Sequence, residues 1–91
     1  MARVIVTLKI MPQSPEVNLD LIKEQAVEKI TKYGGEVGKT EIQPIAFGLN
    51  ALMIYFIQDE SLGGTTKLEE QISSIPGVNS VEVTDVRRAI G

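Results

Sequence analysis

The stretch ALMIYFI, which covers Ala51–Ile57, is apolar or aromatic at every position. Because successive side chains of a β-strand point to opposite faces of the sheet, a strand with this sequence has two faces to bury. Such a strand belongs in the middle of a sheet, with at least part of its second face covered. We therefore expect a central strand over Asn50–Ile57 and arrange the other elements around it.

Three further segments have the pattern of strands. Residues Arg3–Ile10 alternate with a period of two and are rich in β-branched side chains, which predicts a strand with one buried face. Met11–Pro15 ends that strand, because proline has no N–H to donate to a ladder. Gly38–Ile45 is a second β-like stretch, joined to the central strand by a short connection. Valines that alternate with polar residues near the C-terminus predict a last strand, which runs to about Arg88.

Two segments repeat with helical spacing instead. From Asn18 onward, apolar residues recur every three or four positions, which predicts an amphipathic helix of about four turns with Asn18 as its N-cap. Gly34-Gly35 provides a left-handed C-cap. A shorter helix follows a capping box, with Thr66 as N-cap and Glu69 three residues on, and it ends at Pro76-Gly77.

The predicted order of elements is therefore βαββαβ. With right-handed crossovers, this order folds to a four-stranded antiparallel sheet with strand order 4-1-3-2 and both helices on one face, the ferredoxin-like α+β sandwich. A chain of 91 residues has room for one such domain, residues 1–91. RNA-binding, metabolite-sensing, enzymatic and partner-binding proteins all use this sandwich, so the function has to be inferred from particular sites.

The residue types that the chain lacks exclude most catalytic chemistry. It contains no cysteine and no histidine, which removes thiolate nucleophiles, the commonest general base and the commonest metal ligand. Adjacent acids such as Asp59-Glu60 supply too few oxygen ligands for a hard cation. We therefore expect a protein that is not an enzyme and that uses neither a metal nor a cofactor.

No targeting or membrane segment is recognisable in the sequence. The N-terminus is interrupted by charge, unlike a signal peptide. The longest uncharged run, Ile42–Gln58, is broken by Pro44 and Gly48 and falls short of a spanning helix. The composition, 43% hydrophobic and 23% charged, is that of a soluble globular protein. We expect a soluble, cytoplasmic protein that does not bind membranes.

Direct binding of nucleic acid is not expected either. The net charge is -3, whereas RNA-binding domains of this topology carry a basic surface and stack bases on aromatic side chains of the open sheet face. The first strand has no aromatic residue, and the adjacent Tyr55 and Phe56 face opposite ways. We interpret Tyr55 as a half-buried packing residue.

The loop Gly63-Gly64-Thr65-Thr66 precedes a helix and offers backbone amides to a small anion. It lacks the lysine and the spacing of a P-loop, so the simpler interpretation is a flexible loop followed by an N-cap. A metabolite-binding version of the fold would use this loop. We therefore keep a small-molecule-sensing regulatory domain as the alternative function.

The segment Pro44-Ile45-Ala46-Phe47-Gly48 has no obvious structural purpose. Phe47 lies at a hairpin connection, between Pro44 and Gly48, in a chain with only 4% aromatic residues. In one interpretation, Phe47 folds back over the end of the sheet as a lid. In the other, the hairpin presents Phe47 as a rigid aromatic anchor, the kind of side chain that dominates binding energy at protein interfaces.

The C-terminal segment is the other candidate. Arg87 and Arg88 end the last predicted strand of an otherwise acidic chain. Such a pair is usually just solvated. Near the same edge as a docking aromatic, however, it would be able to reach a phosphate or an acidic site on a partner.

The sequence resembles the family of archaeal translation elongation factor 1-beta, which is similar to the C-terminal exchange domain of its eukaryotic counterpart. The resemblance covers essentially the whole chain and rests on four segments: Pro44-Ile45-Ala46-Phe47-Gly48-Leu49 followed by Leu52, the acidic turn Asp59-Glu60, Leu68-Glu69-Glu70-Gln71-Ile72, and the Thr84-Asp85-Val86 end. It implies guanine nucleotide exchange on the GTPase elongation factor 1-alpha in translation elongation, without covalent catalysis. It also implies a bare exchange domain without the N-terminal assembly regions of eukaryotic relatives.

The resemblance assigns roles to single residues as well. The aromatic side chain at Phe47 would dock on the GTPase, while the extreme C-terminus would reach towards its magnesium and phosphate site. In eukaryotic members the penultimate residue is typically a lysine that disturbs the magnesium. Here Ile90 is penultimate, and the nearest cations are Arg87 and Arg88. Either an arginine substitutes for that lysine, or exchange works mainly by distorting the switch and phosphate loops of the partner.

Overall fold

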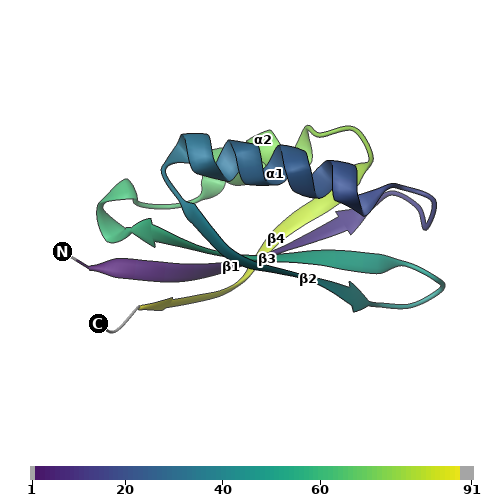
Figure 1. Ribbon diagram of the computed structural model, residues 1–91, viewed down its shortest axis with the longest axis horizontal. Coiled ribbons are helices and arrows are strands. Elements are labelled where there is room, and N and C mark those ends of the chain that lie inside the picture. The colour runs from purple at the N-terminus through teal and green to yellow at the C-terminus, as the bar shows by residue number, and fades with distance from the viewer. Residues whose placement is uncertain (1, 89–91) are drawn as a thin grey trace.

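The computed structural model describes residues 2–88. The elements follow the order β1 (Arg3–Pro12), α1 (Leu19–Tyr33), β2 (Glu36–Pro44), β3 (Asn50–Asp59), the short 3₁₀ helix η1 (Glu60–Leu62), α2 (Thr66–Ser73) and β4 (Val78–Arg88). The strands pair antiparallel in the order β2-β3-β1-β4, and both helices cover the same face of the sheet (Figure 1). The predicted ferredoxin-like α+β fold is confirmed, because 4-1-3-2 is this strand order counted from the opposite edge.

Strand β3 lies inside the sheet, between β2 and β1, as its apolar sequence predicts. Its helix-facing residues Leu52, Ile54 and Phe56 belong to the core, and Met53 on the open face is only 8% exposed. Tyr55 is half-buried, as predicted, and the Lys39 Nζ atom of β2 lies 5.2 Å from the centroid of its ring. The remaining core residues come from β1, both helices, the α2–β4 turn and the start of β4: Val6, Leu8, Ile10, Ile22, Ala26, Ile30, Leu68, Ile72, Ile75 and Val78.

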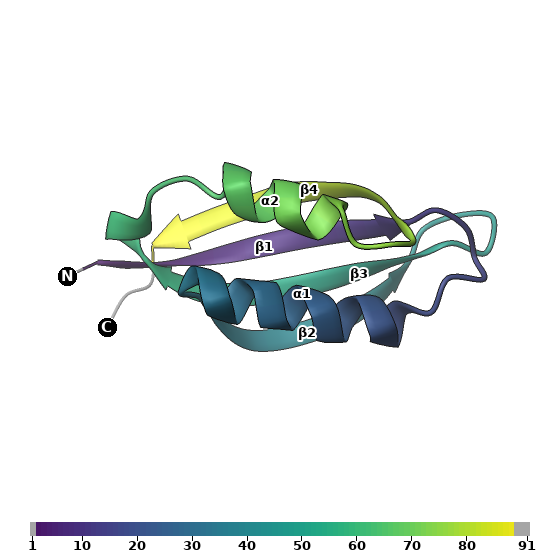
Figure 2. The ribbon, with the colours of Figure 1, turned by 90° about the horizontal axis from the view of Figure 1, so that it is seen from above.

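Helix α1 begins and ends where its sequence predicts. The Asn18 side chain accepts a hydrogen bond of 2.9 Å from the backbone N–H of Asp20, and so satisfies a donor that has no partner within the helix. Gly34 ends the helix with a φ of 113°, a left-handed conformation that glycine adopts without steric cost. In the view from above, α1 lies over β3 and β2, while α2 lies over β1 and β4 (Figure 2).

The N-terminus of α2 differs from the prediction by one residue. The N-cap is Thr65, not Thr66, and no side chain of the described residues accepts from its first backbone amides. The Thr65 hydroxyl instead donates to the Glu69 Oε2 atom at 3.0 Å. The capping-box spacing to Glu69 favours Thr66, but threonine is a suitable N-cap at either position. The approach of the chain from the preceding loop therefore determines which of the two becomes the cap.

Two of the observed strands also continue past their predicted C-terminal ends. β1 continues through Met11 to Pro12, and its last pair, Pro12 with Val78, follows a register irregularity. Because Pro12 stands at the end of the strand, its missing N–H removes no hydrogen bond from the interior of the ladder. β3 continues to Asp59. Gln58, which lies just past the predicted strand end at Ile57, is therefore only 3% exposed, and its Nε2 atom donates to the Gly63 carbonyl oxygen at 3.0 Å.

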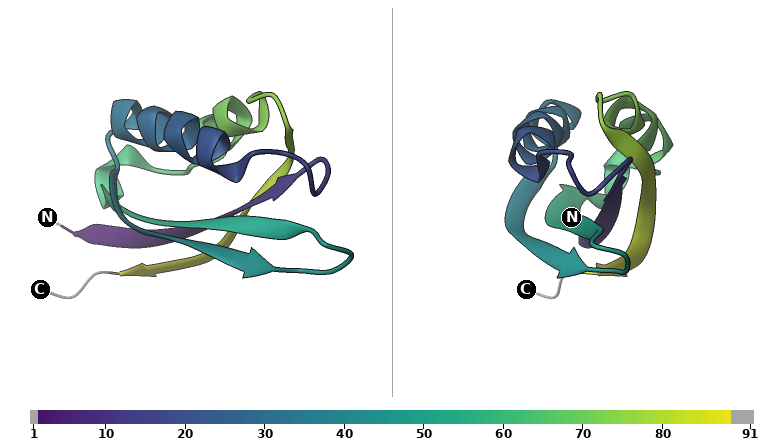
Figure 3. Two further views of the ribbon diagram at one scale, coloured as in Figure 1. Left: turned by 45° about the vertical axis from the view of Figure 1, so that its right-hand side comes forward. Right: turned by 90° about the vertical axis from the view of Figure 1, so that its right-hand side faces the viewer.

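The directions of the strands determine which residues meet at each end of the sheet. Pro44 of β2 pairs with Asn50 of β3 at one end. At the other end, Val4 of β1 pairs with Arg88 of β4. Along β2, a register shift between Val37 and Lys39 leaves Gly38 outside the ladder as a bulge. The sheet is strongly twisted when viewed along its length (Figure 3).

Candidate functional site

The hairpin tip, which we define as residues Pro44–Leu49, connects β2 to β3 and extends past the helices (Figure 3). Two backbone hydrogen bonds of 2.9 Å close it, from Leu49 N–H to the Ala46 oxygen and from Ile45 N–H to the Leu49 oxygen. The two central residues, Phe47 and Gly48, have φ angles of 53° and 77°. Positive φ at both central positions is what the type I′ hairpin turn requires.

The Phe47 side chain is 96% exposed. It therefore does not fold over the end of the sheet as a lid, and its ring contributes almost nothing to the core. Its φ of 53° is also the one positive value at a residue other than glycine within the described part of the chain. A left-handed conformation costs an L-residue about 1–2 kcal/mol. Neither packing nor backbone preference favours phenylalanine here, which is the combination expected of a residue kept for binding.

The other residues of the hairpin tip are consistent with the exposed position of the Phe47 side chain. Pro44 is exposed at the end of β2, an edge strand, where a residue without an N–H is tolerated. Gly48 supplies the second left-handed position of the turn without strain. Ile45 is 41% exposed and adds apolar surface beside Phe47. The candidate residues Pro44, Phe47 and Gly48 thus lie together on one projecting turn.

Arg87 and Arg88 lie at the opposite end of the sheet. Both side chains are exposed; the Arg87 Nε atom lies 2.7 Å from Asp85 Oδ2, and the Arg88 Nη2 atom lies 2.9 Å from Glu60 Oε1. The expectation that they lie near the same edge as Phe47 is wrong. Arg88 of β4 pairs with Val4 near the start of β1, whereas the hairpin tip lies near the other end of β1. Ile90, the third C-terminal candidate, lies outside the described residues.

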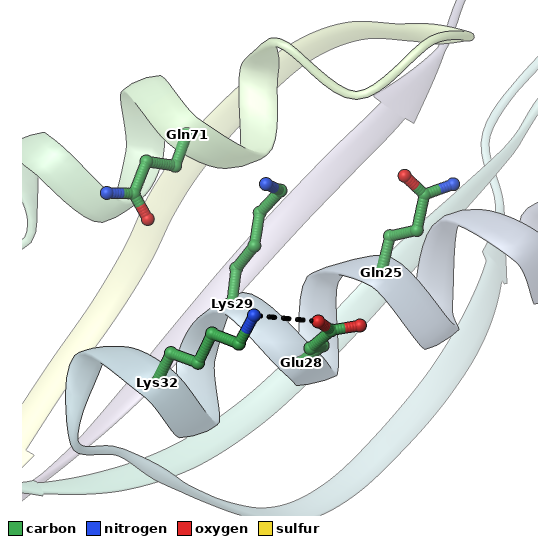
Figure 4. A pocket seen from close by; sticks show the side chains of 5 residues that line it. All are labelled: Gln25, Glu28, Lys29, Lys32 and Gln71. Atoms are coloured by element: carbon green, nitrogen blue, oxygen red, sulfur yellow. Dashed lines mark ion pairs between the residues drawn. The ribbon is translucent and has the colours of Figure 1, made fainter.

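The surface between the two helices forms a polar groove of about 240 Å³, lined by Gln25, Glu28, Lys29, Lys32 and Gln71 (Figure 4). Lys32 Nζ lies 2.9 Å from Glu28 Oε1, and this hydrogen bond and the charge of Lys32 hold the pKa of Glu28 below its ordinary value. Exposed ion pairs of this kind contribute little to stability.

A second cavity, of about 290 Å³, lies beside the loop on which the alternative function depends. It is lined by Val4, Val6, Gln58, Glu60, Gly63, Gly64, Thr65 and Val86. Gln58 was not recognised from the sequence, and its Oε1 atom is buried without a hydrogen-bond partner in the described part of the chain. The one feature of the sequence that points to Gln58 is its position directly after the apolar run Ala51–Ile57.

Within residues 2–88, no cluster of three or more acidic side chains is placed to hold a metal ion. Neither α1 nor α2 has the length and apolar character that a membrane crossing needs.

Comparison with known proteins identifies the family. Residues 5–89 match the model of the EF-1 guanine nucleotide exchange domain. Elongation factor 1-beta of Methanothermobacter thermautotrophicus is 46% identical over 88 residues, which cover 97% of this chain and 98% of that protein. Elongation factor 1-beta of Hyperthermus butylicus is 47% identical over 89 residues, which cover 97% of this chain and 96% of that protein.

Among solved structures, the C-terminal domain of the MgtC protein from Mycobacterium tuberculosis is similar with a TM-score of 0.65 and 12% sequence identity, over 97% of this chain and 88% of that one. At that identity, the likeness concerns the fold alone. The resemblance inferred from the hairpin tip and the other three segments is confirmed by the sequence relatives. The chain belongs to the EF-1 guanine nucleotide exchange domain family.

Proposed function

We propose that this chain promotes the release of GDP from elongation factor 1-alpha during translation elongation, and that residues 1–91 act as one cytoplasmic exchange domain. Family membership supports the class of activity. The observation that carries the proposal is Phe47, a large aromatic side chain that is 96% exposed on a strained turn. We assign it the role of the anchor that enters an apolar pocket on the GTPase.

An exchange factor breaks no covalent bond, so a chain without histidine and cysteine is chemically sufficient. It acts by binding the nucleotide-free GTPase more tightly than the nucleotide-bound form, and the coupling between the two ligands is reciprocal. Accelerating release about ten-thousandfold needs ~5.5 kcal/mol of such differential binding. One buried aromatic anchor contributes about 2–4 kcal/mol. The remainder has to come from contacts with the loops that hold the nucleotide.

Arg87 and Arg88 are the candidates for those further contacts. They lie at the far end of a molecule whose longest dimension is 42 Å, so the partner would span the sheet from the hairpin tip to its other end. Their present partners, Asp85 and Glu60, are exposed. Breaking such an exposed ion pair to bind a phosphate of the partner costs little free energy. Ile90 belongs to the same proposed contact. We expect the Arg87→Ala and Arg88→Ala changes to lower the maximal rate of GDP release more than they weaken binding.

The test is the release of fluorescently labelled GDP from elongation factor 1-alpha, measured with and without this chain. The Phe47→Ala variant should raise the concentration needed for half-maximal acceleration by about 30- to 1,000-fold, the equivalent of ~2–4 kcal/mol. Leu21→Ala provides the matched control, because Leu21 is also apolar and exposed (56%) but lies on α1. Acceleration by Phe47→Ala equal to that of the wild type would contradict the anchor role. No acceleration by the wild type would contradict the function itself.

The cavity at the Gly63-Gly64 loop favours the second candidate, a small-molecule-sensing domain. Val4, Val6 and Val86 form the apolar part of its lining. That function predicts ligand-dependent dimerisation in sedimentation and no effect of the chain on GDP release. The release assay therefore separates the two candidates.

A further inference from the structure

The hairpin that carries Phe47 has two faces, and strand pairing shows which residues lie on each. In an antiparallel sheet, residues directly opposite each other point to the same face. Ile42 of β2 pairs with Leu52 of β3, and Leu52 belongs to the core between the sheet and the helices. Because side chains alternate along a strand, Ile42 and Pro44 both lie on the helix-facing side of β2.

The residues on either side of Ile42 point to the open face of the sheet instead. Glu41 pairs with Met53, which lies on that face, and Gln43 is two residues further along the strand. Both Glu41 and Gln43 are exposed. This part of β2 therefore presents polar side chains on its open face and apolar ones on its helix-facing side.

The apolar side chains of the hairpin are exposed and close together. Ile42 is 51% exposed, and Pro44 is exposed as well; the hairpin tip beyond them extends past the helices (Figure 3). Seven large apolar side chains are exposed within residues 2–88, and three of them lie in the six residues 42–47: Ile42, Ile45 and Phe47. Single exposed apolar residues are ordinary on a protein surface, whereas a contiguous group of them marks an interaction site.

We infer that the GTPase meets the hairpin from its helix-facing side, and that Ile42 and Pro44 continue the contact of Phe47 along β2. This inference rests on the proposed function, since it names the surface that accompanies the anchor. Ile42 and Pro44 lie about 7 Å apart along the strand, and the partner surface that fits them is an apolar groove beside the pocket for Phe47. Approach from the open face would instead desolvate Glu41 and its ion pair with Lys39, which is unfavourable.

The test compares two lysine substitutions at neighbouring positions on opposite faces. Ile42→Lys and Gln43→Lys each add one positive charge, and lysine is well tolerated on an edge strand. Ile42→Lys should raise the concentration of the chain needed for half-maximal GDP release from elongation factor 1-alpha by about tenfold or more, because its ammonium group loses water in an apolar groove. Gln43→Lys should stay within about twofold of the wild type.

A milder variant, Ile42→Thr, guards against a defect in folding. Threonine suits a strand, and it removes apolar surface without adding a charge. About half of Ile42 remains to be buried by a partner, so the required concentration should rise by about three- to tenfold. Thermal unfolding followed by circular dichroism checks that the variants are folded.

Three results would overturn the inference. Equal losses from Ile42→Lys and Gln43→Lys would show that the added charge matters and not the face. A larger loss from Gln43→Lys would place the partner on the open face. No loss from any of the variants at position 42 would show that the contact does not extend beyond the hairpin tip.

Methyl NMR provides a readout that does not depend on exchange. When elongation factor 1-alpha is added, the methyl signals of Ile42 should shift or broaden, whereas that of Met53 on the open face should not. If they respond in this way while the wild type fails to accelerate GDP release, the proposed function is wrong and the contact at Ile42 stands. If the wild type accelerates release while only Met53 responds, the contact at Ile42 is wrong and the proposed function stands.

Discussion

Replacing Phe47 by asparagine should make the protein more stable and less active at the same time. The side chain is 96% exposed, so its removal takes almost no apolar contact from the core. The φ of 53° costs an ordinary L-residue about 1–2 kcal/mol, whereas asparagine tolerates the left-handed region. We expect a gain of about 0.5–1 kcal/mol, which raises the melting temperature of a domain of this size by about 2–8 °C.

The same substitution removes the proposed anchor, so GDP release should need about 30- to 1,000-fold more protein. Stability is measured by thermal unfolding of the isolated chain, followed by circular dichroism, and exchange by release of labelled GDP. Phe47→Tyr is the control, since it keeps the ring and the strained backbone and should match the wild type in both assays. A Phe47→Asn variant that melts at or below the wild-type temperature would refute this reasoning, because the ring would then stabilise the fold.

Two further predictions concern stability alone. A Cβ atom on Gly35 would lie 2.8 Å from Ile30 and 2.9 Å from Phe56, so Gly35→Ala should lower the free energy of unfolding in urea by about 1–3 kcal/mol. A Cβ atom on Gly64 would have nothing within 4 Å, so Gly64→Ala should be neutral or stabilising. A larger loss from Gly64→Ala than from Gly35→Ala would be incompatible with this packing. The pKa of Asp59 is lowered by the backbone hydrogen bond from Ser61 N–H, 2.8 Å long, and by the Ser61 side chain. A lowered pKa gives stability that is present above the unfolded-state pKa and is lost as the pH falls through the folded-state value. The melting temperature of Asp59→Asn should therefore fall less steeply than that of the wild type between about pH 5 and pH 2, and equal slopes would show that this hydrogen bond is not linked to folding.

The sequence predicts the architecture well because local and global signals agree. The two-sided apolar character of β3 requires one of the two interior positions of a four-stranded sheet. Asn18 and Gly34 delimit α1 by capping chemistry that depends on neighbouring residues. The sequence predicts the cap of α2 one residue late, because the spacing to Glu69 favours Thr66 although Thr65 is an equally suitable cap residue. Such a choice is made by the path of the preceding loop, which sequence periodicity does not contain.

The candidate site was predicted in part. The exposure of Phe47 excludes the lid, whereas composition alone leaves both the lid and the anchor open. The separation of Arg88 from Phe47 follows from strand directions that the predicted topology already contains: the start of β3 pairs with the end of β1, and the end of β4 pairs with the start of β1.

The bulge at Gly38 has a consequence for how this protein meets other chains. Unpaired backbone groups along an edge strand invite addition of a foreign strand. On β2 the bulge interrupts that row, the Lys39–Glu41 ion pair places charges along it, and Pro44 removes a donor at its end. An edge strand protected in this way disfavours pairing with a strand of another chain, and so disfavours the aggregation that such pairing causes. We therefore expect recognition on this side of the molecule to depend on a side chain at the turn and not on the backbone of the strand.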